Sequence, residues 1–178
     1  MRYLSHYNSP LGPLTLASDG GAVCGLWLEG QKYYCAKVPE NAPVDDDAPG
    51  FDELRQWLDA YFAGSRPSIA DVPLAPRGSE FQRHVWRILT EIPYGELTTY
   101  GAIAEQIARE RGRATSALAV GGAVGHNPVS IVIPCHRVVG ANGSLTGYAG
   151  GLERKSWLLA HEGVDMSGLF APKRGTAL

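Results

Sequence analysis

A proline-rich segment divides this sequence into two parts with different hydrophobic patterns. Residues 67–76 contain three prolines, each of which lacks a backbone donor and disfavours helix in the residue before it. Short apolar runs typical of strands precede the segment, whereas apolar residues at helical spacing follow it. We therefore expect a linker there, with one domain over residues 1–76 and a second over residues 77–178.

The first part has the pattern of a small α/β unit. Apolar runs at 14–18 and 22–28 flank an Asp-Gly-Gly turn at 19–21, which predicts a β-hairpin. Apolar residues at helical spacing over 51–62 predict a helix that Gly64 ends. The expected fold of this domain is a small antiparallel sheet with a helix.

The second part is mainly helical. Ser79 and Gln82 form a capping-box pattern at the start of a helix that continues to the next proline. A helix capped by Thr98 or Thr99 follows, and then another over residues 115–124. Their short charged connection predicts a helix-turn-helix.

The third of these helices has an unusual composition. Residues 117–124 carry no charge and include the adjacent Gly121 and Gly122, each of which costs a helix interior about 1 kcal/mol relative to alanine. Two explanations stay open. The helix either packs tightly against another helix or is slim enough to enter a narrow groove of DNA.

The charges are unevenly divided between the two parts. The chain has 16 basic and 18 acidic side chains, a net charge of −2. Residues 1–76 have five basic and ten acidic side chains, net −5, whereas residues 77–178 have eleven and eight, net +3. The second part therefore suits a polyanionic partner better, although two solvated surfaces would also explain the difference.

The sequence contains no pattern for export or membrane insertion. No apolar run approaches the roughly 18 residues of a membrane span, so we expect no membrane partner. Cys24, Cys35 and Cys135 are an odd number without a CxxC pair, which predicts free thiols and a reducing, cytoplasmic location. Cys24, Cys35 and His84 lack the paired spacing of a closed metal site, and we expect neither a metal nor a cofactor.

Cys135 differs from the other cysteines in its neighbours. A β-branched run at residues 131–133 leads into Pro134, Cys135, His136 and Arg137. A buried cysteine is usually an inert small hydrophobe, but a histidine and an arginine beside it are expected to lower the pKa of the thiol. We therefore interpret Cys135 as a nucleophile.

Several motifs together carry a resemblance to a known family. Pro-Cys-His-Arg-Val at 134–138 is preceded by Gly-Gly-Ala at 121–123 and Asn-Pro at 127–128, and is followed by Gly-Tyr-Ala-Gly-Gly at 147–151. With the Ser-Pro-Leu-Gly opening at 9–12, this set resembles the O6-alkylguanine-DNA alkyltransferases. The resemblance covers both parts of the chain and implies a monomeric DNA-repair protein.

The resemblance implies a role for each polar residue near the cysteine. Cys135 would take a methyl or other alkyl group from O6 of guanine, with O4 of thymine as a secondary substrate, in one irreversible displacement. His136 would withdraw the thiol proton through a bound water, and Glu162 would orient that histidine. Asn127 would fix the turn between the helix-turn-helix and a strand that carries the cysteine.

The same resemblance implies how the lesion is reached. The alkylated base must leave double-stranded DNA before a buried cysteine can attack it, and the third helix would enter the minor groove. Tyr148 would stack on the base, the Ala149 N–H would approach O6, and the carbonyl groups of Cys135 and Val138 would accept from the exocyclic amine. The implied substrate-binding residues are Tyr100, Val138, Tyr148, Ala149 and Gly150. The implied DNA-binding residues are Thr99, Tyr100, Thr115, Ser116, Ala117, Leu118, Gly121 and Arg137.

One position departs from the family pattern. Members commonly have an arginine finger in the third helix, which fills the space of the extruded base, and the matching residue here is Leu118. An apolar wedge can hold the base stack open but cannot hydrogen-bond the orphaned cytosine, so we expect weaker DNA binding than in an arginine-bearing relative. Arg111 or Arg113 could supply a compensating charge.

Three other functions fit parts of the pattern. A non-catalytic protein that binds alkylated DNA lesions would share the pocket but lack the cysteine, which is present. A regulator that reads the major groove would present Arg, Asn or Gln from its recognition helix, and residues 115–124 contain none of these. A cysteine hydrolase would need the side chains of Cys135 and His136 to meet, which is difficult for adjacent residues.

Overall fold

The computed structural model describes residues 2–172 and divides them into two units. The first unit contains the residues up to Arg77 together with Pro128–Val132, and the second contains the remainder. The division after Arg77 lies one residue from the expected domain boundary. Pro128–Val132, however, were expected in the second domain. These five residues join the first unit because their backbone pairs with Leu26, whose N–H donates to the Pro128 carbonyl at 2.8 Å.

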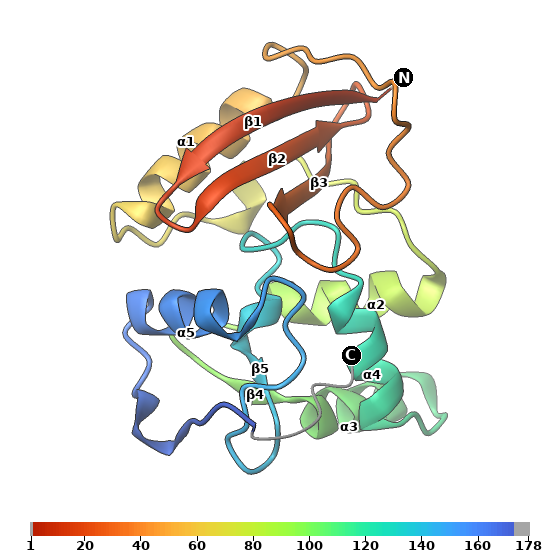
Figure 1. Ribbon diagram of the computed structural model, residues 1–178. Helices are drawn as coiled ribbons and strands as arrows, with labels where there is room; N and C mark the ends of the chain where they lie inside the picture. The colour runs from red at the N-terminus through yellow and green to blue at the C-terminus, as the bar shows by residue number, and fades with distance from the viewer. Residues whose placement is uncertain (1, 173–178) are drawn as a thin grey trace. The chain divides into compact units, whose positions relative to one another are not determined.

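The first unit is an antiparallel sheet of three strands with a helix lying along it (Figure 1). The elements are β1 (Tyr3–Ser9), β2 (Gly12–Ser18), β3 (Val23–Leu28), α1 (Phe51–Phe62) and the short 3-10 helix η1 (Ile69–Asp71). The predicted hairpin and helix are confirmed, whereas β1 was not expected from the sequence. Strand order is β1-β2-β3, and β1 pairs with β2 along its whole length.

Both faces of this sheet are covered. Residues 14–18 of β2 and every residue of β3 are buried, and Leu16 and Leu26 are fully so. Trp27 and Cys24 belong to a buried hydrophobic cluster, and Cys35 packs against that cluster. The Trp27 ring lies over Gly25 so closely that a Cβ there would stand 1.9 Å from it, which explains the glycine within the strand.

The second unit is mainly helical, as expected (Figure 1). Its elements are α2 (Glu80–Thr90), β4 (Thr98–Thr99), α3 (Tyr100–Arg111), α4 (Ala117–Gly125), η2 (Cys135–Arg137), β5 (Val138–Val139), α5 (Leu152–His161) and η3 (Met166–Gly168). The capping box of Ser79 and Gln82 is present, and Thr99 caps α3 by accepting from the Ala102 N–H at 3.1 Å. Because Ser116 is the cap of α4, that helix begins two residues after the predicted start.

The helix-turn-helix is formed by α3 and α4, which contact one another. The Trp86 indole of α2 donates to the Ala123 carbonyl at 2.8 Å, and this hydrogen bond attaches α4 to α2. Among the helices of residues 2–172, none has the length and apolar composition that a membrane crossing requires.

A short parallel ladder joins the helix-turn-helix to the segment after the cysteine. Thr98 pairs with Val138, and Thr99 pairs with Val139. Since Tyr100 is the first residue of α3, this ladder places it beside the chain that leaves η2. The pairing involves only two residues per strand, and the sequence pattern did not predict it.

The β-branched run before the cysteine does not form the expected strand. Residues 131–133 are buried but adopt turn and bend conformations, and Ile131 has a left-handed φ of 71°. Two prolines, Pro128 and Pro134, flank the run and remove donors that a strand would use. Cys135 is therefore the first residue of the short 3-10 helix η2.

Candidate active site

Cys135 is buried and held by one side chain that reaches it from the end of α4. The Asn127 amide donates from Nδ2 to the Cys135 Sγ at 3.1 Å and to the Ile133 carbonyl at 2.8 Å. Asn127 follows the C-cap of α4, so the position of the thiol depends on where the second helix of the helix-turn-helix ends. The expected turn residue thus contacts the sulfur itself.

His136 and Glu162 form a buried pair beside the cysteine. The His136 Nε2 lies 2.6 Å from the Glu162 Oε1, and neither side chain is exposed. Because an ionised carboxylate only accepts hydrogen bonds, Nε2 carries the proton and Nδ1 keeps a free lone pair. Nδ1 is buried and has no hydrogen-bond partner among the described residues.

The pKa of His136 favours the neutral ring. Burial lowers this pKa below its ordinary value, although the hydrogen bond and charge of Glu162 act in the opposite direction. Arg137 and Lys155 lower it further by charge repulsion. At neutral pH the imidazole can therefore accept a proton at Nδ1.

Glu162 is the C-cap residue of α5 and accepts several hydrogen bonds. Burial would raise the pKa of its carboxyl, but donation from His136 and Arg137 holds the pKa well below its usual range. The Gly95 N–H also donates to the Glu162 Oε2 at 3.1 Å. Gly95 has a left-handed φ of 77°, and a Cβ there would lie 2.9 Å from the Glu162 carbonyl oxygen, so only glycine fits.

Arg137 does not face solvent, so the structure does not support its predicted contact with DNA. It is 5% exposed, and its Nε and Nη2 donate to the Glu162 carboxylate at 2.8 and 3.0 Å. Its Nη1 donates to the Ile92 carbonyl at 2.6 Å. These acceptors leave the guanidinium no free edge toward a phosphate, because they turn it into the protein interior.

The expectation of a lowered thiol pKa is wrong. Burial raises the pKa of Cys135, although the Asn127 hydrogen bond and the charge of Lys155 act against that increase. The two neighbours that were expected to lower the thiol pKa do not do so: His136 is neutral, and Arg137 is turned toward Glu162. The resting group is a thiol, and attack therefore needs a base.

One predicted pocket residue, Tyr148, lies beside His136. The Tyr148 ring meets the His136 ring edge-on with centroids 6.5 Å apart, and the Tyr148 hydroxyl is buried without a partner among the residues described. The Tyr100 hydroxyl donates to the Thr146 carbonyl at 2.9 Å. Ala149 is half-buried and Gly150 is buried in the segment that leads to α5.

One predicted carbonyl contact is already occupied. The Val138 carbonyl accepts from the Lys155 Nζ at 2.5 Å, and the remaining lone pair of that oxygen is the one left for a base amine. Lys155 was not predicted as a site residue. Its position on a helix next to glutamate and arginine is typical of a solvated lysine, and nothing in the sequence marks it as buried.

The predicted DNA-binding residues of α4 divide between two faces. Residues 116–118 are exposed at the start of the helix, with Leu118 at 75%. Thr115, just before the cap of α4, and Thr99, the cap of α3, are half-buried. Gly121 lies on the buried face, where it packs within the unit, so its predicted DNA contact is not supported by the structure. Arg111 is paired with Glu80 at 2.5 Å, whereas Arg113 is exposed.

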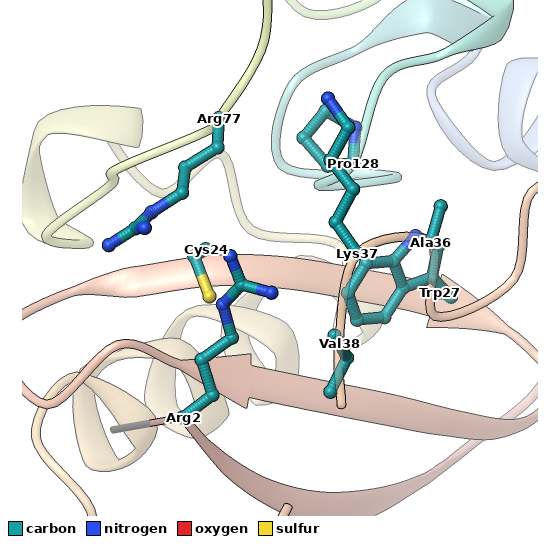
Figure 2. Close-up of a pocket in the computed structure, with 8 residues that line it drawn as sticks. All are labelled: Arg2, Cys24, Trp27, Ala36, Lys37, Val38, Arg77 and Pro128. Carbon is teal, nitrogen blue, oxygen red and sulfur yellow. The ribbon is translucent and has the colours of Figure 1, made fainter. Parts of the chain in front are cut away.

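The first unit has a small hollow beside Cys24, shown in Figure 2 with the Arg2 guanidinium next to the sulfur. Its volume is about 20 Å³, which holds about one water molecule. Burial raises the pKa of the Cys24 thiol, so this cysteine is not an activated nucleophile. Cys35 packs against the same cluster, and His84 instead contacts Glu110 at 2.6 Å in the second unit.

Two sequence profiles of one family match the chain. Residues 80–164 match "6-O-methylguanine DNA methyltransferase, DNA binding domain", and residues 2–76 match "6-O-methylguanine DNA methyltransferase, ribonuclease-like domain". The chain belongs to the 6-O-methylguanine DNA methyltransferase family. Its site of Asn127, Cys135, His136 and Glu162 lies within the matched DNA-binding domain.

Relatives of this methyltransferase family cover nearly the whole chain. The methylated-DNA–protein-cysteine methyltransferase of Methanosarcina acetivorans is 46% identical over 162 residues, which is 90% of this chain and 98% of that protein. The protein of the same name from Mycolicibacterium paratuberculosis is 49% identical over 155 residues, or 87% of this chain and 88% of the relative. The structure of Mycobacterium tuberculosis OGT in complex with DNA is similar with a TM-score of 0.76, 44% identity and coverage of 90% of this chain and 92% of that one.

Proposed function

We propose that this protein repairs DNA by moving a methyl or other alkyl group from O6 of guanine onto Cys135. O4 of thymine is a secondary candidate substrate. One observation carries the proposal: in a member of this family, a buried cysteine, Cys135, accepts a hydrogen bond from Asn127 and is followed in sequence by His136, which is paired with Glu162. The relatives' shared name, methylated-DNA–protein-cysteine methyltransferase, supports the same reaction.

The proposed chemical step is one displacement. The Cys135 proton passes to the free lone pair of His136 Nδ1 through a water molecule, while Glu162 keeps the ring oriented through Nε2. The sulfur then forms a bond to the alkyl carbon as the carbon–O6 bond breaks, and the bonding pair stays with guanine. The thiol proton ends on guanine, so the products are a neutral thioether, normal guanine and neutral His136.

The reaction is proposed to occur once per molecule. A thioether is not hydrolysed under physiological conditions, so the alkylated cysteine is a final product. Apart from the bridging water, every group in the step belongs to the chain or the substrate, and the proposed activity uses neither a metal nor a cofactor.

Access to the lesion is proposed to occur through base extrusion from double-stranded DNA. The exposed start of α4, residues 116–118, carries small side chains and Leu118, which suits a minor groove and an apolar wedge. Tyr148 and the Ala149 N–H would receive the extruded base near Cys135. Tyr100, at the start of α3, would leave the Thr146 carbonyl to contact the nucleotide.

We propose a supporting role for residues 1–76, because none of the side chains in the proposed step comes from that domain. The three cysteines are free, which is consistent with the proposed cytoplasmic location. A monomeric state is expected, and light scattering of the purified protein measures it.

A restriction-site assay separates repair from lesion binding. A duplex whose recognition site contains O6-methylguanine resists its endonuclease until the methyl group is removed. The duplex is incubated with the protein, which phenol extraction then removes. If the protein repairs DNA, the endonuclease should cut one duplex for each molecule of wild-type protein added. Duplex incubated with Cys135→Ser should stay resistant. Cys35→Ser is the matched control and should repair normally. If the wild type binds the duplex but the extracted DNA stays resistant, the non-catalytic alternative is correct.

A further inference from the structure

Lys155 is a charged side chain of the active site that the proposed step does not use. It lies on α5 and is 0% exposed. Lysine is almost never fully buried unless its ammonium is paired, because removing an unpaired charge from water is costly. A lysine at this depth therefore requires a compensating group.

The ammonium joins two segments that border the pocket. Its Nζ donates to the Val138 carbonyl at 2.5 Å and to the Thr146 carbonyl at 3.0 Å. Val138 directly follows η2, and Thr146 comes two residues before Tyr148. The Tyr100 hydroxyl donates to the same Thr146 carbonyl, so Lys155 fastens the Tyr148 segment where the helix-turn-helix also reaches it.

These carbonyl contacts provide no counter-ion. Within residues 2–172, the ion pairs of the site connect Glu162 with His136 and Arg137, and none of them includes Lys155. The titratable groups that face the ammonium are Cys135 and His136 of η2, with Tyr100 of α3 at the shared carbonyl. Burial lowers the pKa of Lys155 to about 8, and the charge of Cys135 opposes that shift. Among the described residues that act on this cation, Cys135 is the group that becomes an anion in the proposed step, once His136 has taken its proton.

We propose that Lys155 is a positioning residue for alkyl transfer, whose buried ammonium holds the Tyr148 segment against β5 and favours the Cys135 thiolate electrostatically. The inference rests on the proposed function of Cys135. Lys155 keeps its proton throughout, so the balance of the displacement is unchanged. The cation lowers the energy of the state in which charge develops on sulfur.

Iodoacetamide measures the thiolate without any alkylated base. The experiment follows carbamidomethylation of Cys135 by peptide mapping, as a function of pH, in the wild type, Lys155→Met and Lys155→Arg. Loss of the cation should slow the reaction at neutral pH about tenfold, equivalent to about 1.4 kcal/mol, and move the pH curve upward by about one unit. Lys155→Arg should restore part of this loss. Arg109→Met removes an exposed charge of the same sign and should leave the pH curve unchanged.

A purely structural role predicts the opposite result. If Lys155 only held the segment in place, Lys155→Met would expose the sulfur, and Cys135 would react faster with an unchanged pH curve. That outcome would overturn the electrostatic part of the inference.

The wild type provides a second test that does not depend on how well a variant folds. Transfer from free O6-benzylguanine should rise from acid pH to a level rate near neutral pH and then fall above about pH 8, as Lys155 loses its proton. A rate that continues to rise well beyond that pH would overturn the inference. Failure of the two proposals is distinguishable. If the iodoacetamide curves are as expected but no benzyl adduct forms, the proposed function alone is wrong. If the benzyl adduct forms normally but Lys155→Met behaves as the wild type, the role of Lys155 alone is wrong.

Discussion

Arg137 binds both carboxylate oxygens of Glu162, with its Nε 2.8 Å from Oε2 and its Nη2 3.0 Å from Oε1. This buried pair keeps Glu162 ionised without requiring a charge on His136. The histidine can then remain neutral while its Nε2 donates to the same carboxylate at 2.6 Å. The arrangement explains how a thiol whose pKa is raised by burial can still be deprotonated when the substrate arrives.

Replacement of Glu162 by glutamine should lower the free energy of unfolding at neutral pH by about 3 kcal/mol, because Arg137 is left buried without its partner. The folded-state pKa of Glu162 lies below the ordinary value of 4.5. Its stabilisation is therefore complete above pH 4.5 and decreases as the pH falls toward the folded-state pKa. Urea unfolding should show a steeper loss of stability below pH 4.5 in the wild type than in Glu162→Gln.

The matched control for that measurement is Glu91→Gln, which changes an exposed carboxyl of the same unit. It should leave both the stability at neutral pH and the slope in acid unchanged. Equal slopes for the wild type and Glu162→Gln would contradict the account of the buried carboxylate.

Transfer to Cys135 should have an acid limb set by His136. Since burial lowers the pKa of this ring below its ordinary 6.5, the transfer rate should be level just below neutral pH and fall only at pH values under 6.5. His136→Gln should lose at least about 100-fold in rate. His6→Gln, an exposed histidine of the first unit, should keep the wild-type profile. An inflection at or above pH 6.5 would show that the ring is charged in the resting protein.

Removal of the Asn127 amide should affect both stability and the thiol. Asn127→Ala leaves the Ile133 carbonyl without its 2.8 Å donor, which should cost about 1–3 kcal/mol of unfolding free energy. The sulfur loses a donor as well, so its reaction with iodoacetamide at neutral pH should slow. Asn142→Ala, a change in an exposed turn, serves as the control. An unchanged iodoacetamide rate in a folded Asn127→Ala protein would exclude the contact with sulfur as a cause of reactivity.

Leu118→Arg should strengthen DNA binding. The residue is 75% exposed at the start of α4, and an arginine there adds a charge and a donor for the orphaned cytosine. Fluorescence anisotropy with a duplex at several salt concentrations should show a lower Kd and a salt slope larger by about one unit. Val44→Arg adds the same charge at another exposed apolar position and should have little effect. Equal DNA binding and equal transfer rates for Leu118→Arg and the wild type would refute the role of this position.

Local signals made the secondary structure predictable. Ser79 with Gln82, and Thr99 before α3, fix helix starts through contacts between near neighbours in the chain. The Asp-Gly-Gly turn determines the β2–β3 hairpin in the same way, because its Asp19 side chain accepts from the Ala22 N–H at 3.1 Å. The nucleophilic role of Cys135 could be predicted for a related reason, because the motif around it is continuous in sequence.

Long-range contacts explain what the sequence did not predict. Lys155 is buried because two carbonyl groups, those of Val138 and Thr146, converge on it from other segments. Arg137 follows the cysteine in sequence but is turned away by Glu162, 25 residues later. The same applies to Gly95, whose contact with Glu162 depends on how α5 ends. Neighbours in sequence therefore suggested a lowered thiol pKa that the fold does not produce.

The most direct test of the central claim is intact-mass spectrometry after incubation with an O6-methylguanine duplex. The account predicts that each protein molecule gains the mass of one methylene group, that peptide mapping places it on Cys135, and that excess duplex adds nothing more. Cys135→Ser should gain nothing, and Cys24→Ser should behave as the wild type. An unchanged mass for the wild type in the presence of excess duplex, or a methyl group on Cys24 or Cys35, would contradict the account.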